Sequence, residues 1–300
     1  MQNQFRYLAR FTIETNTPLS IGSGRGGLLN QRLIAKDANG LPYIPGTALA
    51  GVVRHELAKQ AVNQAAIEKL FGYQHLLAKD GQGSRIDFSS AHLLAEDGQT
   101  VLEGLCEIDF SQAYYQNFKR LPERDHVRID HRGVAVKHNK FEEELVHRGT
   151  RFVFELELQG TAADKTHWQI ILGILNAPMF RVGAGTRKGF GQFKVIDCTH
   201  REYDLSQKEA LLAYLGKSSS LNQALQGWSL YQAQTIKNTW TTYSITLKAR
   251  DFFLYSAGTG NKHADVTPKK EKIFVWPEQG SPQLEERYLL PATSIKGALA

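Results

Sequence analysis

Residues 21–54 read IGSGRGGLLNQRLIAKDANGLPYIPGTALAGVVR. The stretch opens with a glycine-dense turn and ends in a helix, which we expect from Ala48 to about Lys69 with Thr47 as its cap. Glycine lets a backbone approach a phosphate chain closely and leaves its N–H donors uncovered. The turn and the helix start therefore predict an anion-binding groove built from Gly22, Gly24, Arg25, Gly26, Arg32 and Lys36.

The same pattern occurs a second time near the end of the chain. Residues 258–260 (GTG) match residues 22–24 (GSG), and residues 290–297 (LPATSIKG) match residues 44–51 (IPGTALAG). A single glycine-rich loop before a helix is more often a flexible surface loop. The repetition favours a binding function for both loops.

The two copies set the expected domain organisation. The strands before the two loops alternate apolar and polar residues in the same phase, at 5–13 and 243–249. A repeated strand–loop–helix unit, far longer than a solenoid period, indicates a duplicated domain. Because the second copy reaches Ala300 inside its helix, we expect the chain to be part of a longer one. The expected units are a first domain over 1–200, a linker over 201–238 and the N-terminal part of a second domain over 239–300.

Composition limits the class of protein. Of the 300 residues, 42% are hydrophobic and 22% charged, which is typical of a soluble globular protein. No apolar run is long enough to span a membrane, and Cys106 and Cys198 lack the spacing of a zinc site. We therefore expect a cytoplasmic protein without a membrane partner. The net charge of +6 modestly favours a polyanionic partner.

The order of the expected elements indicates the fold class. It is strand, helix, strand, insertion, strand, helix, strand, at about 5–14, 48–69, 84–94, 105–148, 150–159, 168–175 and 190–195. This order is that of an α+β, ferredoxin-like (RRM-like) fold with a four-stranded antiparallel sheet and helices on one face.

A second glycine cluster precedes the last strand of this unit. Residues 181–191 read RVGAGTRKGFG. Glycines here could simply let the chain turn, but their alternation with basic residues favours a phosphate-contacting loop. The residues that we expect to contact phosphate are Gly183, Gly185, Arg187 and Lys188.

Four segments together carry a family resemblance: residues 21–24, 40–47, 144–152 and 183–191. They resemble the RAMP superfamily of CRISPR-associated proteins, and more narrowly the backbone subunits that polymerise along guide RNA in type III effector complexes. The resemblance covers most of residues 5–196 and resumes near Tyr243. The tandem copies suggest a fused backbone subunit. The implied partners are guide RNA, complementary target RNA and other effector subunits.

The resemblance implies an inserted β-hairpin thumb that presses into the guide–target duplex, here at residues 127–144. Backbone contacts are then expected from Arg128, His131, Arg132, Lys137, His138 and Lys140, and wedging between bases from Val134, Val136 or Phe141. Two alternatives remain open. The hairpin could be merely solvated, or Asp125, His126, Asp130 and His131 could hold a metal.

The resemblance also assigns cations to the helix starts. Arg54 in the first copy and Lys296 in the second would hold the guide backbone. Each copy keeps one of two expected cations, since Ala50 aligns with Lys296 and Arg54 with Ala300. As part of an ordinary amphipathic helix, Arg54 would only be a solvated residue.

Target cleavage in the family uses a loop aspartate with divalent metal. Gln31 occupies that position in the first copy, so we expect the first domain to bind RNA without cutting it. In the second copy, Asp265 is the candidate catalytic residue, with Mg2+ as its cofactor. No motif in the chain binds a cofactor by itself.

Two alternative functions follow from the same residues. One is a guide-precursor-processing endoribonuclease of the same superfamily, with His55, His126 or His131 as the general base. The other is a ferredoxin-like protein that does not bind RNA, in which the glycine loops are incidental.

Overall fold

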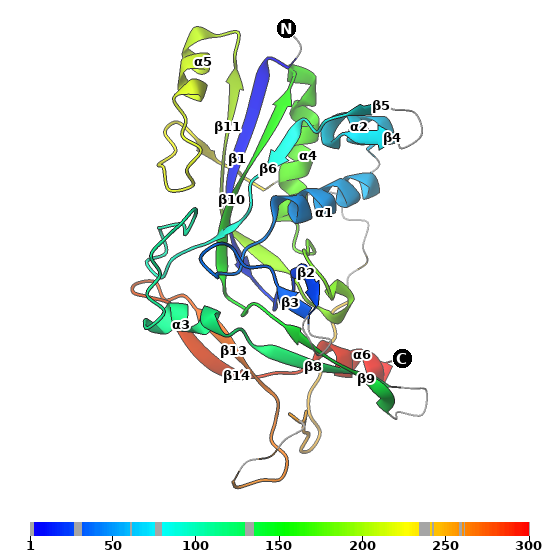
Figure 1. The fold of residues 1–300 in the computed structure, drawn as a ribbon. Coiled ribbons are helices and arrows are strands. Elements are labelled where there is room, and N and C mark those ends of the chain that lie inside the picture. The colour runs from blue at the N-terminus through cyan, green and yellow to red at the C-terminus, as the bar shows by residue number, and fades with distance from the viewer. Residues whose placement is uncertain are drawn as a thin grey trace.

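The structure, a computed structural model, describes residues 3–26, 32–60, 62–75, 80–129, 135–233, 241, 243–257, 260 and 262–299. Within them it is a mixed α+β fold built on antiparallel sheets (Figure 1). No helix within these ranges has both the length and the apolar character that a membrane crossing requires.

A central antiparallel sheet forms the upper part of the molecule in Figure 1. Its strand order is β12 (Ser229–Leu230), β11 (Phe193–Asp204), β1 (Phe5–Thr15), β10 (Arg151–Gly160) and β6 (Ile86–Phe88), with β7 (His92–Leu93) also paired to β10. The alternation in β1 arises because side chains of successive strand residues face opposite sides of a sheet.

Two helices cover one face of this sheet. They are α1 (Gly46–Lys59) and α4 (Lys165–Asn176). Tyr7 and Phe11 of β1, Leu49 of α1 and Trp168 of α4 are fully buried in one continuous core. Apolar stripes of both helices therefore pack on the apolar face of β1 and β10.

The other face of the sheet is polar and is also covered. Helix α5 (Lys208–Leu215) and the segment that leads to β12 lie over it. Arg10 Nε donates to Glu155 Oε1 at 2.7 Å, and Arg10 Nη1 donates to the Gln223 carbonyl at 2.7 Å. Residues 201–238, expected as a linker, thus contain the end of β11, α5 and β12.

A second sheet lies below the first. Its order is β2 (Gly22–Gly26), β3 (Arg32–Ile34), β9 (Ala135–Glu144) and β8 (Glu123–Ile129). Strands β8 and β9 form the hairpin expected at 127–144, which begins four residues earlier than expected. Strand β3 joins β9 in parallel through Arg32 and Glu143. The first glycine loop and the hairpin are therefore parts of one sheet.

The C-terminal residues pack against the main core. Strands β13 (Lys270–Val275) and β14 (Gln283–Tyr288) form a hairpin, followed by α6 (Ala292–Leu299). Phe274 is buried in the main core against Tyr114 of α3 (Ala113–Lys119), and Trp276 Nε1 donates to the Gly149 carbonyl at 2.7 Å. A methyl group at Gly149 would lie 2.0 Å from the Phe274 carbonyl oxygen, so this contact requires glycine.

The expected helix at 48–69 is in fact two helices. The first, α1, ends at Lys59, and α2 (Gln64–Phe71) starts after Asn63, whose side chain accepts hydrogen bonds from the N–H groups of Ala65 and Ala66. This N-cap starts a new helix. The expected cap at Thr47 is wrong, because α1 begins at Gly46 with Pro45 as its N-cap and no side-chain cap bond.

Two expected strands also differ. The strand at 84–94 is broken into β6 and β7, because Ala91 leaves β10 and bridges to Ile44 instead. The short pair β4 (Tyr73–His75) and β5 (Asp80–Gln82) precedes it. The described residues of 243–249 form no strand, and Tyr243, Ile245 and Leu247 are exposed. No neighbouring strand pairs with them in the described part of the chain, and alternation alone cannot make a strand without a partner.

Candidate nucleic-acid interface

The two glycine clusters that lie far apart in the sequence are in contact. The Ala184 N–H donates to the Ser20 carbonyl at 2.7 Å, and the Gly191 N–H donates to the Pro18 carbonyl at 2.9 Å. A methyl group at Gly183, whose φ is +89°, would lie 2.3 Å from the Ser20 oxygen. Glycine at 183 is thus required by the close approach of the two loops.

The first glycine turn is open rather than packed. Gly22 and Gly24 are exposed. Gly24 has φ +75°, and apart from its chain neighbours no atom of the described residues lies within 4 Å of the position that a methyl group would take. Glycine at position 24 is therefore favoured by the positive φ of the turn and not by a close contact with another segment. Arg25 and Gly26 belong to β2 and Arg32 to β3, but the side chains of both arginines, and Gln31 as a whole, lie outside the described residues.

A buried carboxylate joins both loops to the hairpin. Glu143 of β9 has no exposed side-chain surface. Its Oε1 accepts from Ser20 Oγ at 2.7 Å, while Oε2 lies 3.1 Å from His126 Nε2 and 3.6 Å from Lys188 Nζ. Burial alone would raise the pKa of Glu143, but these three partners outweigh it and lower that pKa to about 2.

Aromatic rings complete this junction. The His126 and Phe141 rings stack with centroids 5.0 Å apart, and Lys188 Nζ lies 4.8 Å from the Phe141 centroid. Arg124 lies over the Phe190 ring at 5.0 Å. These cation–π contacts hold the base of the hairpin against the late glycine loop. Phe141, expected as a wedge between bases, is placed in this junction.

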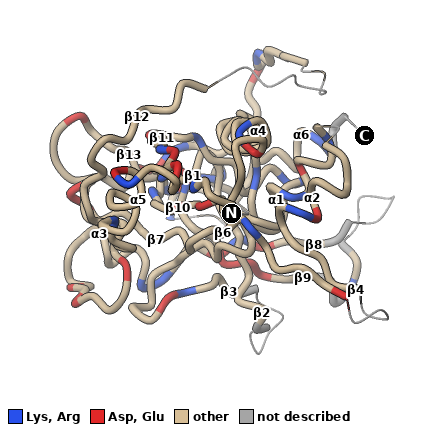
Figure 2. Tube along the Cα trace, turned by 90° about the horizontal axis from the view of Figure 1, so that it is seen from above, with Lys and Arg blue, Asp and Glu red and all other residues tan. Residues whose placement is uncertain are grey.

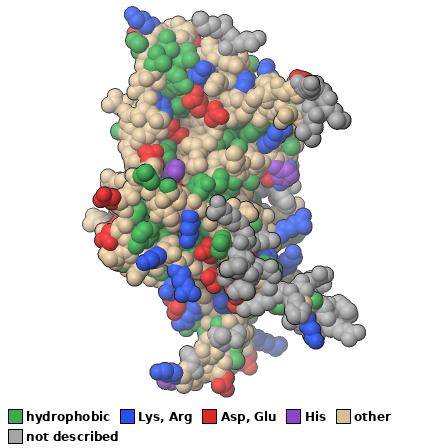
Figure 3. Space-filling view, viewed as in Figure 1, with side chains coloured by type: hydrophobic (Ala, Val, Ile, Leu, Met, Phe, Trp, Pro, Cys, Tyr) green, Lys and Arg blue, Asp and Glu red, His purple; other side chains and the backbone are tan. Residues whose placement is uncertain are grey.

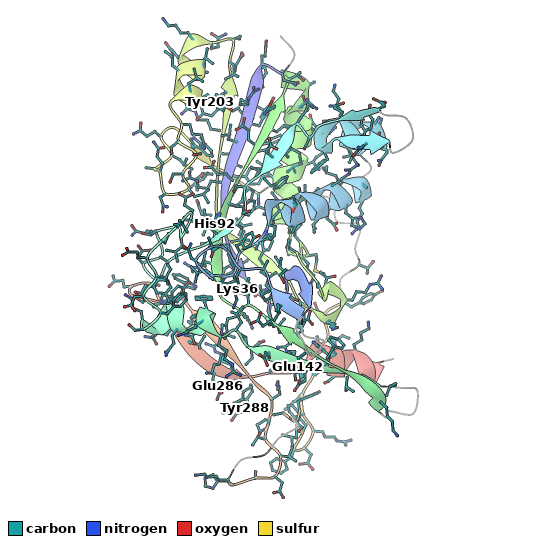
Figure 4. The ribbon with its side chains drawn as sticks, viewed as in Figure 1. Lys36, His92, Glu142, Tyr203, Glu286 and Tyr288 are labelled. Atoms are coloured by element: carbon teal, nitrogen blue, oxygen red, sulfur yellow. The ribbon has the colours of Figure 1, made fainter. Side chains whose placement is uncertain are left out.

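The remaining expected cations differ in how freely they face solvent. Lys188 is 31% exposed and pairs with Glu143, and Lys36 Nζ lies 4.0 Å from Glu144 Oε1. Part of the charge of both lysines is therefore used to hold protein segments together. Arg187 is exposed on the short 3-10 turn at Thr186–Lys188, and Arg54 is half-buried on α1. Neither makes an ion pair within the described part of the chain. Figure 4 labels Lys36 beside the second sheet.

Helix α6, at the position expected for the helix of a second copy, begins next to the late glycine loop. A methyl group at Gly189 would lie 3.6 Å from the Cβ of Ala292, the first residue of α6. Lys296 follows on this helix and is exposed. Figure 2 shows α6, α1 and the β8–β9 hairpin on one side of the molecule, away from α3 and β13. Helix α6 therefore begins beside the late loop.

Several residues expected to form the thumb cannot be placed. His131 and Arg132 lie outside the described residues, and so do the side chains of Arg128 and Lys140. Lys137 is exposed on β9. Arg181, close to the late loop in sequence, donates to the carbonyls of Gly189 and Phe190, so it braces the loop.

The structure also places the candidates for chemistry. Asp265 is exposed in the irregular segment before β13. Within the described ranges, no three His, Cys, Asp or Glu side chains are close enough to hold a metal ion. Of the candidate general bases, His55 is exposed on α1 and His126 has its Nε2 beside Glu143.

Two important residues of this region were missed by reading the sequence. Ser20 and Glu143 look like ordinary polar residues beside the glycine loop and inside the run 142–144 (EEE). The only signal in the sequence was an acidic run next to an apolar strand in a basic chain. Their role depends on contacts between segments more than 120 residues apart.

A comparison with known protein families identifies the region that carries this geometry. The family described as RAMP superfamily matches residues 12–194. The match spans both glycine loops, the β8–β9 hairpin and Glu143. A search of curated proteins finds no match to the chain.

Proposed function

The chain belongs to the RAMP superfamily, and on this premise we propose that it is a guide-RNA-binding backbone subunit of a type III CRISPR interference complex. The family match supports a CRISPR-associated, RNA-binding role. The narrower role as a backbone subunit rests on the arrangement of the loops and on the internal repeat.

One observation carries the proposal. Two glycine-rich loops touch each other and the base of a long hairpin, and helix α6 begins beside the second of these loops. The first loop presents an exposed glycine turn, and Arg187 of the late loop and Lys296 of α6 are also exposed. Backbone N–H groups in glycine turns and nearby cations are the groups that bind a sugar–phosphate strand. Sequence-independent contacts of this kind suit a subunit that must hold any guide.

The fold supports a palm of ferredoxin-like type. The order β11-β1-β10-β6, with α1 and α4 on one face, is the order that such a palm requires. In RRM domains the open sheet face stacks RNA bases. Here α5 covers that face, with Tyr214 Oη bonded to Glu157 at 2.7 Å. The RNA path therefore runs along the loops and not over the sheet.

The repeat extends the proposal to a tandem protein. Helix α6 begins at Ala292, where the alignment with the first copy places a helix start. It lies beside Gly189 of the first copy's late loop. A guide strand that leaves the first groove would meet Lys296 next, so one RNA could run along both copies.

Cleavage of target RNA is assigned to the second copy, through Asp265. Mg2+ is commonly held by one or two protein carboxylates together with substrate phosphates. Asp265 is a single exposed carboxylate, so it could hold Mg2+ only when phosphate oxygens of the RNA complete the coordination. When bound, the metal would ionise or orient the attacking hydroxyl. The first copy, with Gln31 in place of the aspartate, binds without cutting.

Salt-dependent RNA binding tests the proposal. Fluorescence anisotropy with single-stranded RNA should show log affinity falling with log salt. Arg187→Gln and Arg54→Gln should each reduce the magnitude of that slope by about 1. Lys208→Gln, on α5 across the sheet, is the matched control and should leave the slope unchanged. If the protein ignores RNA even at low salt, the proposal is wrong.

A further inference from the structure

A pocket exists that the RNA path described above does not use. It has a volume of about 390 Å³ and lies between the end of α3, the start of β8, the segment before β10 and β13. Its lining residues are Asn117, Arg120, Leu121, Pro122, Glu123, His147 and Lys272. Ligand pockets in proteins have volumes of this order. Because Lys272 comes from the C-terminal hairpin, the pocket exists only when that hairpin is docked.

Two cations stand at the pocket. Arg120 and Lys272 are exposed, and neither forms an ion pair with a carboxylate in the described ranges of the chain. One lining carboxylate, Glu123, is also exposed. The pocket lining thus carries two positive side chains and one carboxylate that can accept a hydrogen bond. A purely acidic ligand would be repelled by that carboxylate, so it fits the pocket poorly.

The rear of the pocket is rigid and uncharged. Leu121 is buried, and His147 is buried with its Nδ1 3.3 Å from the Lys272 carbonyl. Burial lowers the pKa of His147, so the ring is neutral at pH 7. The His147 ring also packs edge-on against Phe274, whose burial anchors the hairpin. These contacts hold the rear wall of the pocket in place.

An exposed aromatic ring stands beside the cations. Lys270 and Tyr288 are cross-strand partners, and Tyr288 is 76% exposed. The Lys270 ammonium lies 5.5 Å from the ring centroid and is paired with Glu286 Oε2 at 2.8 Å. Lys270 and Lys272 share one face of β13, because alternate strand residues point the same way. Figure 4 labels Tyr288 and Glu286 on β14, and Figure 3 shows Lys and Arg side chains gathered over this end of the molecule.

We propose that this pocket and Tyr288 form a second binding site for single-stranded RNA. A phosphate binds between Arg120 and Lys272, and a base stacks on Tyr288, since cations next to an exposed ring form the standard platform for unpaired nucleotides. Glu123 accepts a hydrogen bond from an N–H group of a base, such as N3–H of uracil. The site lies on the α3 side, across the molecule from α1 and α6. The inference rests on the proposed function, because it adds a contact for the same class of ligand.

Photocrosslinking to the whole chain tests this site. A short oligouridylate that carries thiouridine is irradiated with the protein, and crosslinked peptides are mapped by mass spectrometry. Peptides from 117–123 and 270–288 should be labelled, in addition to those around the glycine loops. Tyr288→Leu should weaken crosslinking at this site about tenfold, and Arg120→Gln with Lys272→Gln should abolish it. Tyr243→Leu, at another exposed tyrosine, is the control.

The outcomes separate the two proposals. Crosslinks at the glycine loops without any at 117–123 or 270–288 would overturn the second site and leave the main function standing. No crosslink anywhere would overturn both. Displacement of the probe by polyglutamate, with dependence on Arg120 and Lys272 but not on Tyr288, would replace RNA by an acidic peptide as the occupant.

Discussion

The carboxylate of Glu143 lies 3.6 Å from the ammonium of Lys188, although one residue belongs to the hairpin and the other to the late glycine loop. Ser20, which leads into the first glycine loop, binds the same carboxylate. One buried acid thus fixes three segments that the proposed RNA groove requires. The spacing between the loops and the hairpin depends on this contact.

Glu143→Gln should lower the free energy of unfolding at pH 7 by about 2–4 kcal/mol, because it leaves buried partners without their anion. The folded pKa of Glu143 is about 2, below its ordinary value of 4.5. The stabilisation is therefore complete above pH 4.5 and is lost as pH falls toward 2. Urea unfolding at several pH values measures both effects.

In that series the difference between wild type and Glu143→Gln should shrink as the solution is acidified. Glu107→Gln, at an exposed position, should have no comparable effect. Asp164 also has a pKa lowered to about 2, against burial, by Arg85 and Thr161. It contributes acid sensitivity that both proteins share. A difference that stays constant with pH would contradict the role of Glu143.

Lys188 and Arg187 are neighbours with different expected roles. Lys188→Gln should reduce both RNA affinity and stability, the latter by roughly 1–3 kcal/mol, because Lys188 neutralises Glu143. Arg187→Gln should reduce RNA affinity alone, because Arg187 is exposed. Anisotropy and urea unfolding of the two variants give the comparison. Equal losses of stability would show that Arg187, like Lys188, stabilises the fold, and would contradict its assignment to RNA binding alone.

Two glycines of α1 should respond in opposite ways to alanine. Gly51 has open space around it, so Gly51→Ala should stabilise the protein by about 0.5–1 kcal/mol through helix propensity. A methyl group at Gly46 would lie 2.0 Å from the Phe88 carbonyl oxygen, so Gly46→Ala should destabilise by about 1–3 kcal/mol. Thermal unfolding measures both. Stabilisation by Gly46→Ala would refute the close contact with β6.

Docking of the C-terminal hairpin can be tested at Gly149. Gly149→Ala combines a φ of +83° with overlap onto the Phe274 carbonyl, so it should detach β13 and β14. Gly104 has a similar φ of +68°, and among the described residues no atom would contact an added methyl group. Gly104→Ala therefore measures the cost of the backbone strain by itself, about 1–2 kcal/mol. Hydrogen exchange of residues 270–288 should rise only in Gly149→Ala. Equal exchange in both variants would contradict the docking contact.

The nuclease assignment has a direct test. With guide RNA bound, cleavage of complementary RNA should require Mg2+, stop with EDTA and disappear in Asp265→Asn. Asp251→Asn changes another exposed aspartate of the same segment and should cut normally. Normal cutting by Asp265→Asn would make the assignment wrong while leaving RNA binding untouched.

Local pattern was a good guide where one face of an element is buried. The alternation in 5–14 and 150–159 predicted β1 and β10, which pair along their whole length. The apolar run at 168–175 predicted α4. The pattern failed at Asn63, where one capping side chain starts a second helix. It also failed at 243–249, where no strand in the described part of the chain pairs with the alternating stretch. Neither the cap nor the missing partner can be read from the period of apolar residues.

Residue order alone was enough to predict the α+β class, β1, β10 and α4 of the central layer, the two glycine clusters and the family. These properties follow from periodicity and from residues that permit a turn, and both are local. The folded chain was needed to show that the clusters touch, that Glu143 joins them to the hairpin and that Phe274 docks at Gly149. Such contacts depend on which distant partners meet in three dimensions. A carboxylate or a glycine reads the same in sequence whether it is buried against a cation or exposed to water.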